Sequence, residues 1–135
     1  MRLSDNSLRK ILAFAAIVEV GTGLALMIRP AMVVTSLLGA SESGGGRPLG
    51  RFFGVALLAL GLACWPSRQR AESGSPPFRA MLTYNVLVAL YLGYLGTVRD
   101  LGGVLLWPAV ALHAGVALLL LWAARDERRT KATTT

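Results

Sequence analysis

The stretch ILAFAAIVEVGTGLALMI, residues 11–28, is apolar except for Thr22 and one carboxylate, Glu19. A helix of this length rises about 27 Å, close to the roughly 30 Å of a bilayer's hydrocarbon core. Charged residues flank it, with Lys10 before it and Arg29 after it. The stretch therefore predicts a membrane-spanning helix, and because no small-x-small cleavage site closes it we expect the helix to be retained. It also raises the question of what holds Glu19 inside it.

Three further apolar blocks predict three more spans. The chain of 135 residues is 54% hydrophobic, with a mean hydropathy of +0.56, which is more apolar surface than a core of this size can bury. Its charged residues lie almost entirely between the blocks. We expect an all-α integral membrane bundle of four transmembrane helices in a single domain, with spans at about 11–28, 49–65, 80–98 and 102–124 and a basic cytoplasmic tail at 125–135.

The segment RPAMVVTSLLG, residues 29–39, follows the first predicted span. Pro30 stands where a helix can start, and the apolar residues after it suit a short helix on the membrane surface or a bent continuation of the first span. The glycine-rich segment 40–50 lacks the Lys-Ser/Thr pair of a phosphate-binding loop, so we expect only a connection there.

The basic residues set the expected orientation. With four spans, the two termini lie on the same side of the membrane. Ten of the 14 Lys and Arg residues lie on that side, and four lie on the opposite side. Since Lys and Arg gather on the cytoplasmic side, both termini should be cytoplasmic. These residues adjoin spans instead of forming a stripe on a soluble fold, so the net charge of +7 predicts the lipid bilayer as a partner and no nucleic acid.

Glu19 is the first candidate functional residue. An ionised carboxylate in hydrocarbon costs several kcal/mol, so it should face protein and have a partner there. Its helical neighbours form a face of mostly small residues that lets another helix approach: Leu12, Ala15, Ala16, Thr22, Gly23 and Leu26.

His113 is the leading predicted partner of Glu19, because both lie about 12 to 16 Å from the cytoplasmic ends of their spans. Asn85 and Tyr84 of the third span are the next candidates, and Thr22 belongs to the same polar group. Two roles stay open for this cluster. It either satisfies buried polar groups and fixes helix register, or it forms a protonatable pair coupled to transport or electron transfer.

The chain lacks the other residues that a catalytic or metal site would need. Its one cysteine, Cys64, suits a small apolar filler, and its one histidine leaves haem without the usual second axial histidine. No Ser-His-Asp set and no paired loop carboxylates stand out. We therefore expect no enzyme activity, no cofactor and no metal.

Small residues at four-residue spacing predict close helix contacts. Gly50, Gly54 and Gly61 line one side of the second span, and Gly93 lies in a similar series in the third. This spacing does not separate contacts within the chain from contacts between chains. A homo-oligomer or a larger membrane complex therefore stays open.

Two resemblances add to this interpretation. The segment AAIVEVGTGLALM, residues 15–27, resembles the first helix of small multidrug resistance transporters, which implies that Glu19 is a shared proton and cation site. The segments EVGTGLALMIRP, RFFGVALLALGLACWP, YNVLVALYLGYLG and LLWPAVALHAGVALLLLW together resemble small bacterial four-helix membrane proteins that are distantly DoxX-like. This second resemblance implies a fold and a membrane location, and it points to quinone-linked redox chemistry without assigning a residue.

The sequence thus favours a structural or accessory protein of the bacterial inner membrane with a buried polar cluster of Glu19, His113 and Asn85. The first alternative is a proton-coupled small-molecule transporter that uses Glu19. The second is a subunit of a quinone-linked redox complex.

The predicted orientation can be tested with a carboxyl-terminal fusion to a reporter that is active only in the periplasm. We expect no reporter signal, because the basic residues beside the termini should hold both ends in the cytoplasm. A fusion to the loop after residue 40 serves as the positive control. A strong signal from the carboxyl-terminal fusion would reverse the assigned orientation.

Overall fold

The computed structural model describes residues 5–40, 46–66 and 72–133. Within these residues it contains no strands and five helices: α1 (Asp5–Ile28), α2 (Pro30–Leu38), α3 (Gly46–Ala63), α4 (Pro76–Thr97) and α5 (Leu106–Thr133). All except α2 are long and apolar enough to cross a membrane. The predicted all-α fold with four span-length helices is confirmed, and so is the short helix after the first span.

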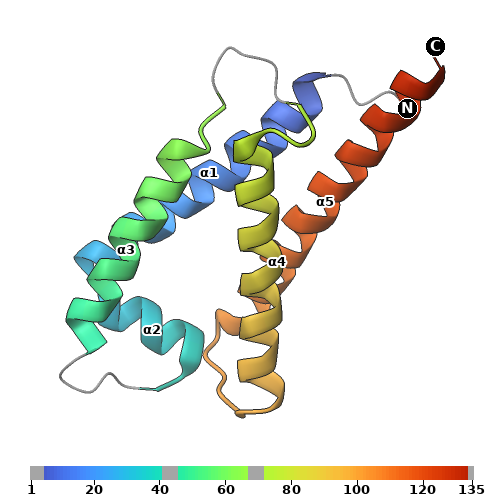
Figure 1. The fold of residues 1–135 in the computed structure, drawn as a ribbon. Helices are drawn as coiled ribbons and strands as arrows, with labels where there is room; N and C mark the ends of the chain where they lie inside the picture. Colours follow the sequence, from blue (N-terminus) through green and yellow to red (C-terminus); the bar gives the residue numbers. More distant parts are fainter. Residues whose placement is uncertain (1–4, 41–45, 67–71, 134–135) are drawn as a thin grey trace.

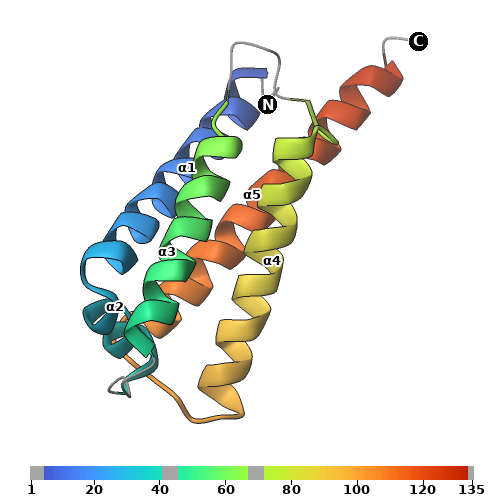
Figure 2. The same ribbon diagram turned by 60° about the vertical axis from the view of Figure 1, so that its left-hand side comes forward.

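The four long helices form two pairs. Helix α1 packs along α3, and α4 packs along α5, while the contacts between the pairs are far fewer. Figure 1 shows the two pairs diverging toward the end at which α2 lies across the bundle. Both termini lie at the opposite end, as Figures 1 and 2 show.

The outer surfaces of the long helices are apolar. Ile28 on α1, Leu90 on α4 and Leu118 on α5 are 71%, 67% and 66% exposed, respectively. Soluble monomers rarely expose apolar surface on this scale, whereas hydrocarbon chains cover it without cost. The distribution therefore suits a multi-pass membrane protein.

The apolar core occupies the half of the bundle nearer the termini. There the beginnings of α1 and α4 meet the carboxyl-terminal half of α5, and Leu12, Met81 and Leu120 are almost completely buried. Cys64 is a buried free thiol in this core, where it packs as the small apolar filler expected from the sequence. Among the described residues, the half that contains α2 has no comparable core cluster.

Glycines bring α1 and α3 into backbone contact. A Cβ added to Gly54 would lie 2.7 Å from the carbonyl oxygen of Gly23, and one added to Gly61 would lie 2.8 Å from the carbonyl oxygen of Ala16. Gly50 is also buried on α3. Larger side chains would separate the two helices, so these glycines set the α1–α3 distance.

Gly93 does not share this role. An added Cβ would meet nothing within 4 Å, so Gly93 makes no close contact with another described helix of the chain, and a contact between chains at Gly93 stays a prediction. The small residues on α4 have the four-residue spacing that is typical of helix contacts. The face that carries Gly93, however, points away from the other helices of the chain. Spacing alone cannot show which face of a helix meets a neighbour.

The connection between α4 and α5 binds the carboxyl-terminal end of α2. The Gly103 and Leu105 amides donate hydrogen bonds to the carbonyl oxygens of Leu37 and Ser36, at 3.0 and 2.8 Å. These bonds satisfy carbonyls that the end of a helix otherwise leaves unpaired. Gly39 ends α2 in the left-handed conformation, at φ 70°, and its amide donates to the Thr35 carbonyl.

Because of this contact, the helix of the fourth span starts later than predicted. Residues 102–105 are not helical, because two of their amides are engaged by α2, and α5 begins at Leu106 instead of Gly102. Pro108 therefore lies in the first turn of α5, where its missing amide hydrogen costs nothing. At its other end α5 continues through the predicted tail to Thr133. The helices α3 and α4 begin at Gly46 and Pro76, a turn earlier than the predicted spans.

Substitution of Gly54 tests the α1–α3 contact. Gly54→Leu should destabilise the protein by about 1 to 3 kcal/mol, because its side chain would overlap the Gly23 carbonyl and the Met27 side chain. The measurement is thermal unfolding in detergent. Gly93→Leu is the matched control, since it makes the same change at a helical glycine with open space around it. Equal melting temperatures for the two variants would contradict this packing.

Candidate functional site

Glu19 is buried at the centre of the bundle. It lies on α1 beside Ala15, Ala16 and Gly23, and it is only 1% exposed, in agreement with its predicted orientation toward protein. The Tyr84 side chain of α4 lies beside the Glu19 carboxyl group, with its hydroxyl within reach of it. This contact joins the α1–α3 pair to the α4–α5 pair.

Asn85, the next residue of α4, forms the second polar contact. Its Nδ2 donates to the carbonyl oxygen of Met81 at 2.8 Å, and its Oδ1 lies 2.8 Å from Nδ1 of His113 on α5. Asn85 is 1% exposed, so both ends of its amide are satisfied inside the protein. It therefore links α4 to α5 at a fixed register.

The Asn85 contacts determine which nitrogen of His113 carries the proton. The Met81 carbonyl can only accept, so it is paired with Nδ2 and leaves Oδ1 facing the ring. Since Oδ1 is also only an acceptor, Nδ1 of His113 carries the hydrogen and donates it. No hydrogen bond to the Nε2 atom is found in the described part of the chain.

Tyr84 and His113 connect the two contacts. Their ring centroids lie 5.7 Å apart with an interplanar angle of 80°, an edge-to-face arrangement. Glu19, Tyr84, His113 and Asn85 consequently form one continuous polar cluster across α1, α4 and α5. The cluster lies directly against the apolar core, because Tyr84 also packs on the core residues.

The structure brings together four of the five predicted cluster residues but changes their pairing. The predicted Glu19–His113 hydrogen bond is wrong: Glu19 is paired with Tyr84, and His113 is paired with Asn85. Thr22 is partly buried, and no hydrogen bond joins its side chain to the cluster among the residues described. The rotation of α4 places Tyr84 beside both Glu19 and His113.

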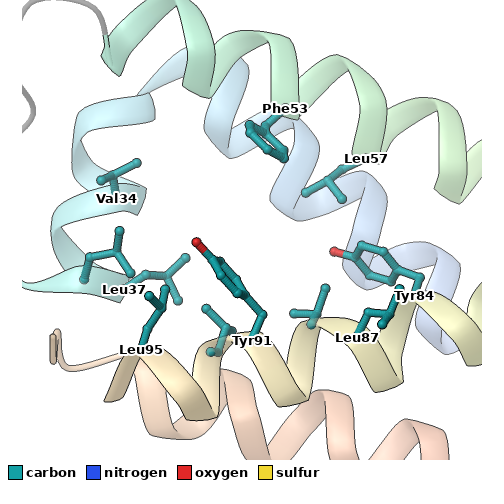
Figure 3. Close-up of a pocket in the computed structure, with 11 residues that line it drawn as sticks. Val34, Leu37, Phe53, Leu57, Tyr84, Leu87, Tyr91 and Leu95 are labelled. Carbon is teal, nitrogen blue, oxygen red and sulfur yellow. The ribbon is translucent and has the colours of Figure 1, made fainter. Parts of the chain in front are cut away.

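A cavity of about 490 Å³ borders the cluster on the side of α2. Figure 3 shows it between α3 and α4, with α2 at one end and with the Tyr84 and Tyr91 side chains reaching into it. The remaining lining is apolar and includes Phe53 and Leu57 of α3. The sequence analysis missed this cavity, although the seven-residue spacing of Tyr84 and Tyr91 places both on one face of α4.

The cluster does not form a group of metal ligands. Among the described residues, no three His, Cys, Asp or Glu side chains come close enough together to hold an ion. What the arrangement provides is one buried carboxyl group, one buried imidazole and two polar contacts that run from one helix to another. No protein-family model, curated protein or solved structure matches the chain.

A double-mutant cycle tests the Asn85–His113 contact. Asn85→Ala and His113→Ala should each lower the free energy of unfolding by about 1 to 3 kcal/mol, since each leaves a buried polar partner unsatisfied. The double variant should lose less than the sum of the two. Combining Asn85→Ala with Thr97→Ala is the control, because Thr97 bonds only within its own helix, to Gly93, and the two effects should add within about 0.5 kcal/mol. Additive effects for Asn85 and His113 would contradict the contact.

The Tyr84 hydroxyl can be tested separately from its ring. Tyr84→Phe keeps the edge-to-face contact with His113 but leaves Glu19 without its donor, so we expect a loss of about 1 to 3 kcal/mol in detergent unfolding. Tyr94→Phe is the matched control on the same helix, because Tyr94 is 47% exposed and lies outside the cluster. Equal stabilities of the two variants would mean that the Tyr84 hydroxyl does not stabilise Glu19.

Proposed function

We propose that the chain is a structural or accessory protein of the bacterial inner membrane, with both termini in the cytoplasm and without enzymatic activity. The observation that carries this proposal is that the polar contacts of the cluster run from one helix to another. They join α1 to α4, where the two helix pairs otherwise share few contacts, and α4 to α5 within one pair. The location of both termini at one end supports the predicted topology.

The structural role follows from the energetics of polar groups in hydrocarbon. An unpaired amide or carboxyl group in the bilayer costs several kcal/mol, so separation of the two helix pairs would expose groups that cannot find water. A substrate that took the place of Met81 or His113 at the Asn85 amide would have to break a helix-to-helix or intrahelical hydrogen bond. These contacts therefore suit helix association better than the repeated binding and release of a substrate.

A proton-coupled transporter is the second candidate, and one observation favours it. Tyr84 belongs both to the cluster and to the lining of the cavity, so its side chain separates Glu19 from the space between α3 and α4. Displacement of Tyr84 would give a ligand in that space access to a titratable carboxyl group. This is the arrangement that exchange of a proton for a substrate requires.

Glu19→Gln distinguishes the two candidates, because the amide keeps the size and the acceptor oxygen of the carboxyl group but cannot titrate. For a structural protein we expect a melting temperature within a few degrees of the parent. We also expect that, under an imposed pH gradient, ethidium is transported into proteoliposomes of the parent and of the variant no faster than into protein-free vesicles. Glu72→Gln, at an exposed position, is the control for the change in charge. Gradient-driven ethidium transport by the parent that is lost only in Glu19→Gln would establish the transporter instead.

A further inference from the structure

The cavity between α3 and α4 is a groove with α2 at one end. Its α4 wall is formed by residues from Tyr84 to Leu95, its opposite wall by Phe53 and Leu57 of α3, and its end by Val34 and Leu37 of α2. Helices α3 and α4 do not pack against each other as a pair, so the groove opens between them toward the lipid. In a bilayer this space is filled by something other than water.

The groove has the dimensions of one leaflet. The three turns of α4 from Tyr84 to Leu95 rise about 16 Å, and one leaflet contributes roughly 15 Å of hydrocarbon. The groove runs along α4, from Tyr84 at mid-helix to α2 at the end of the bundle opposite the termini. An acyl chain extended along the bilayer normal matches both this length and this direction.

The polar groups of the groove are placed unequally along it. At the inner end, the Tyr84 hydroxyl already interacts with Glu19. A ligand at this end therefore meets mainly apolar surface. Beside α2 the Tyr91 hydroxyl points into the groove, and no hydrogen bond to it is found in the described residues. An unpaired hydroxyl at this depth favours an occupant that brings an acceptor oxygen to the α2 end.

We propose that the groove between α2, α3 and α4 binds one acyl chain of a phospholipid from the leaflet on the α2 side. The terminal methyl lies near Tyr84 and Leu87, and an ester carbonyl oxygen accepts a hydrogen bond from the Tyr91 hydroxyl. The bound lipid holds the two helix pairs apart at this end while α2 and the α4–α5 connection hold them together. This inference is independent of whether Glu19 has a structural or a transport role.

Photolabelling of the full chain in vesicles of phosphatidylethanolamine and phosphatidylglycerol tests the bound chain directly. The probe is phosphatidylglycerol with a diazirine placed either at the methyl end or next to the ester of one acyl chain. The methyl-end probe should label the segments around Leu57 and Leu87, and the ester-end probe those around Val34 and Leu37. Labelling should exceed that around Leu118, a lipid-facing residue of α5 outside the groove, several-fold. Equal labelling around Leu118, or the reverse order of the two probes, would overturn the proposal.

A groove-filling variant gives the second test. Leu57→Trp should remove one retained phospholipid per chain, measured as phosphorus after purification in mild detergent, because the indole would occupy the space of the acyl chain. Leu118→Trp makes the same change on an outer surface and should retain as much phospholipid as the parent. Unchanged retention in a folded Leu57→Trp variant would overturn the proposal. If Leu57→Trp does not fold, the photolabelling of the parent decides, and a crosslink between two chains across the groove would identify a second copy as the occupant.

Discussion

The fold depends on the need of one carboxyl group in hydrocarbon for a protein partner. Glu19 cannot face lipid without a cost of several kcal/mol, and the Tyr84 hydroxyl is what the bundle provides. Helix α1 has few contacts with α4, so this polar contact adds to the apolar core in connecting the two helix pairs. It also places Asn85, the next residue of α4, against His113. One pairing therefore determines the rotation of α4 and, through it, the register of α5.

The polar cluster separates two halves of the bundle that differ in packing. Toward the termini, Leu12, Met81 and Leu120 fill an apolar core, whereas toward α2 the helix pairs diverge around the groove. Two sets of backbone contacts stabilise this half: the glycine contacts of α1 with α3 within one pair, and the bonds of Gly103 and Leu105 to α2. The α3 wall and the α2 end of the groove are thus each held by backbone contacts.

The sequence predicted the parts of this structure that depend on composition and depth. Long apolar blocks indicated four spans, Pro30 indicated a short helix, and small neighbours indicated the inward face of Glu19. It could not predict helix rotation, which depends on the sum of all contacts, so His113 was paired with Glu19 instead of Asn85. The same limitation explains Gly93, whose spacing is typical of contact but whose face is open. The later start of α5 was missed because it depends on a long-range contact with α2.

A structural and a transport role differ in what the Tyr84 side chain must do. In a structural protein, the hydrogen bond to Glu19 is kept permanently, and the groove beyond it serves only to accommodate lipid. In a transporter, the same hydrogen bond must break in each cycle, and an acyl chain in the groove would compete with the substrate for the space beside Tyr84. A tightly bound lipid therefore favours the structural role, since its displacement would add to the cost of exposing a carboxyl group to hydrocarbon. The occupant of the groove and the function of Glu19 are consequently linked through one tyrosine.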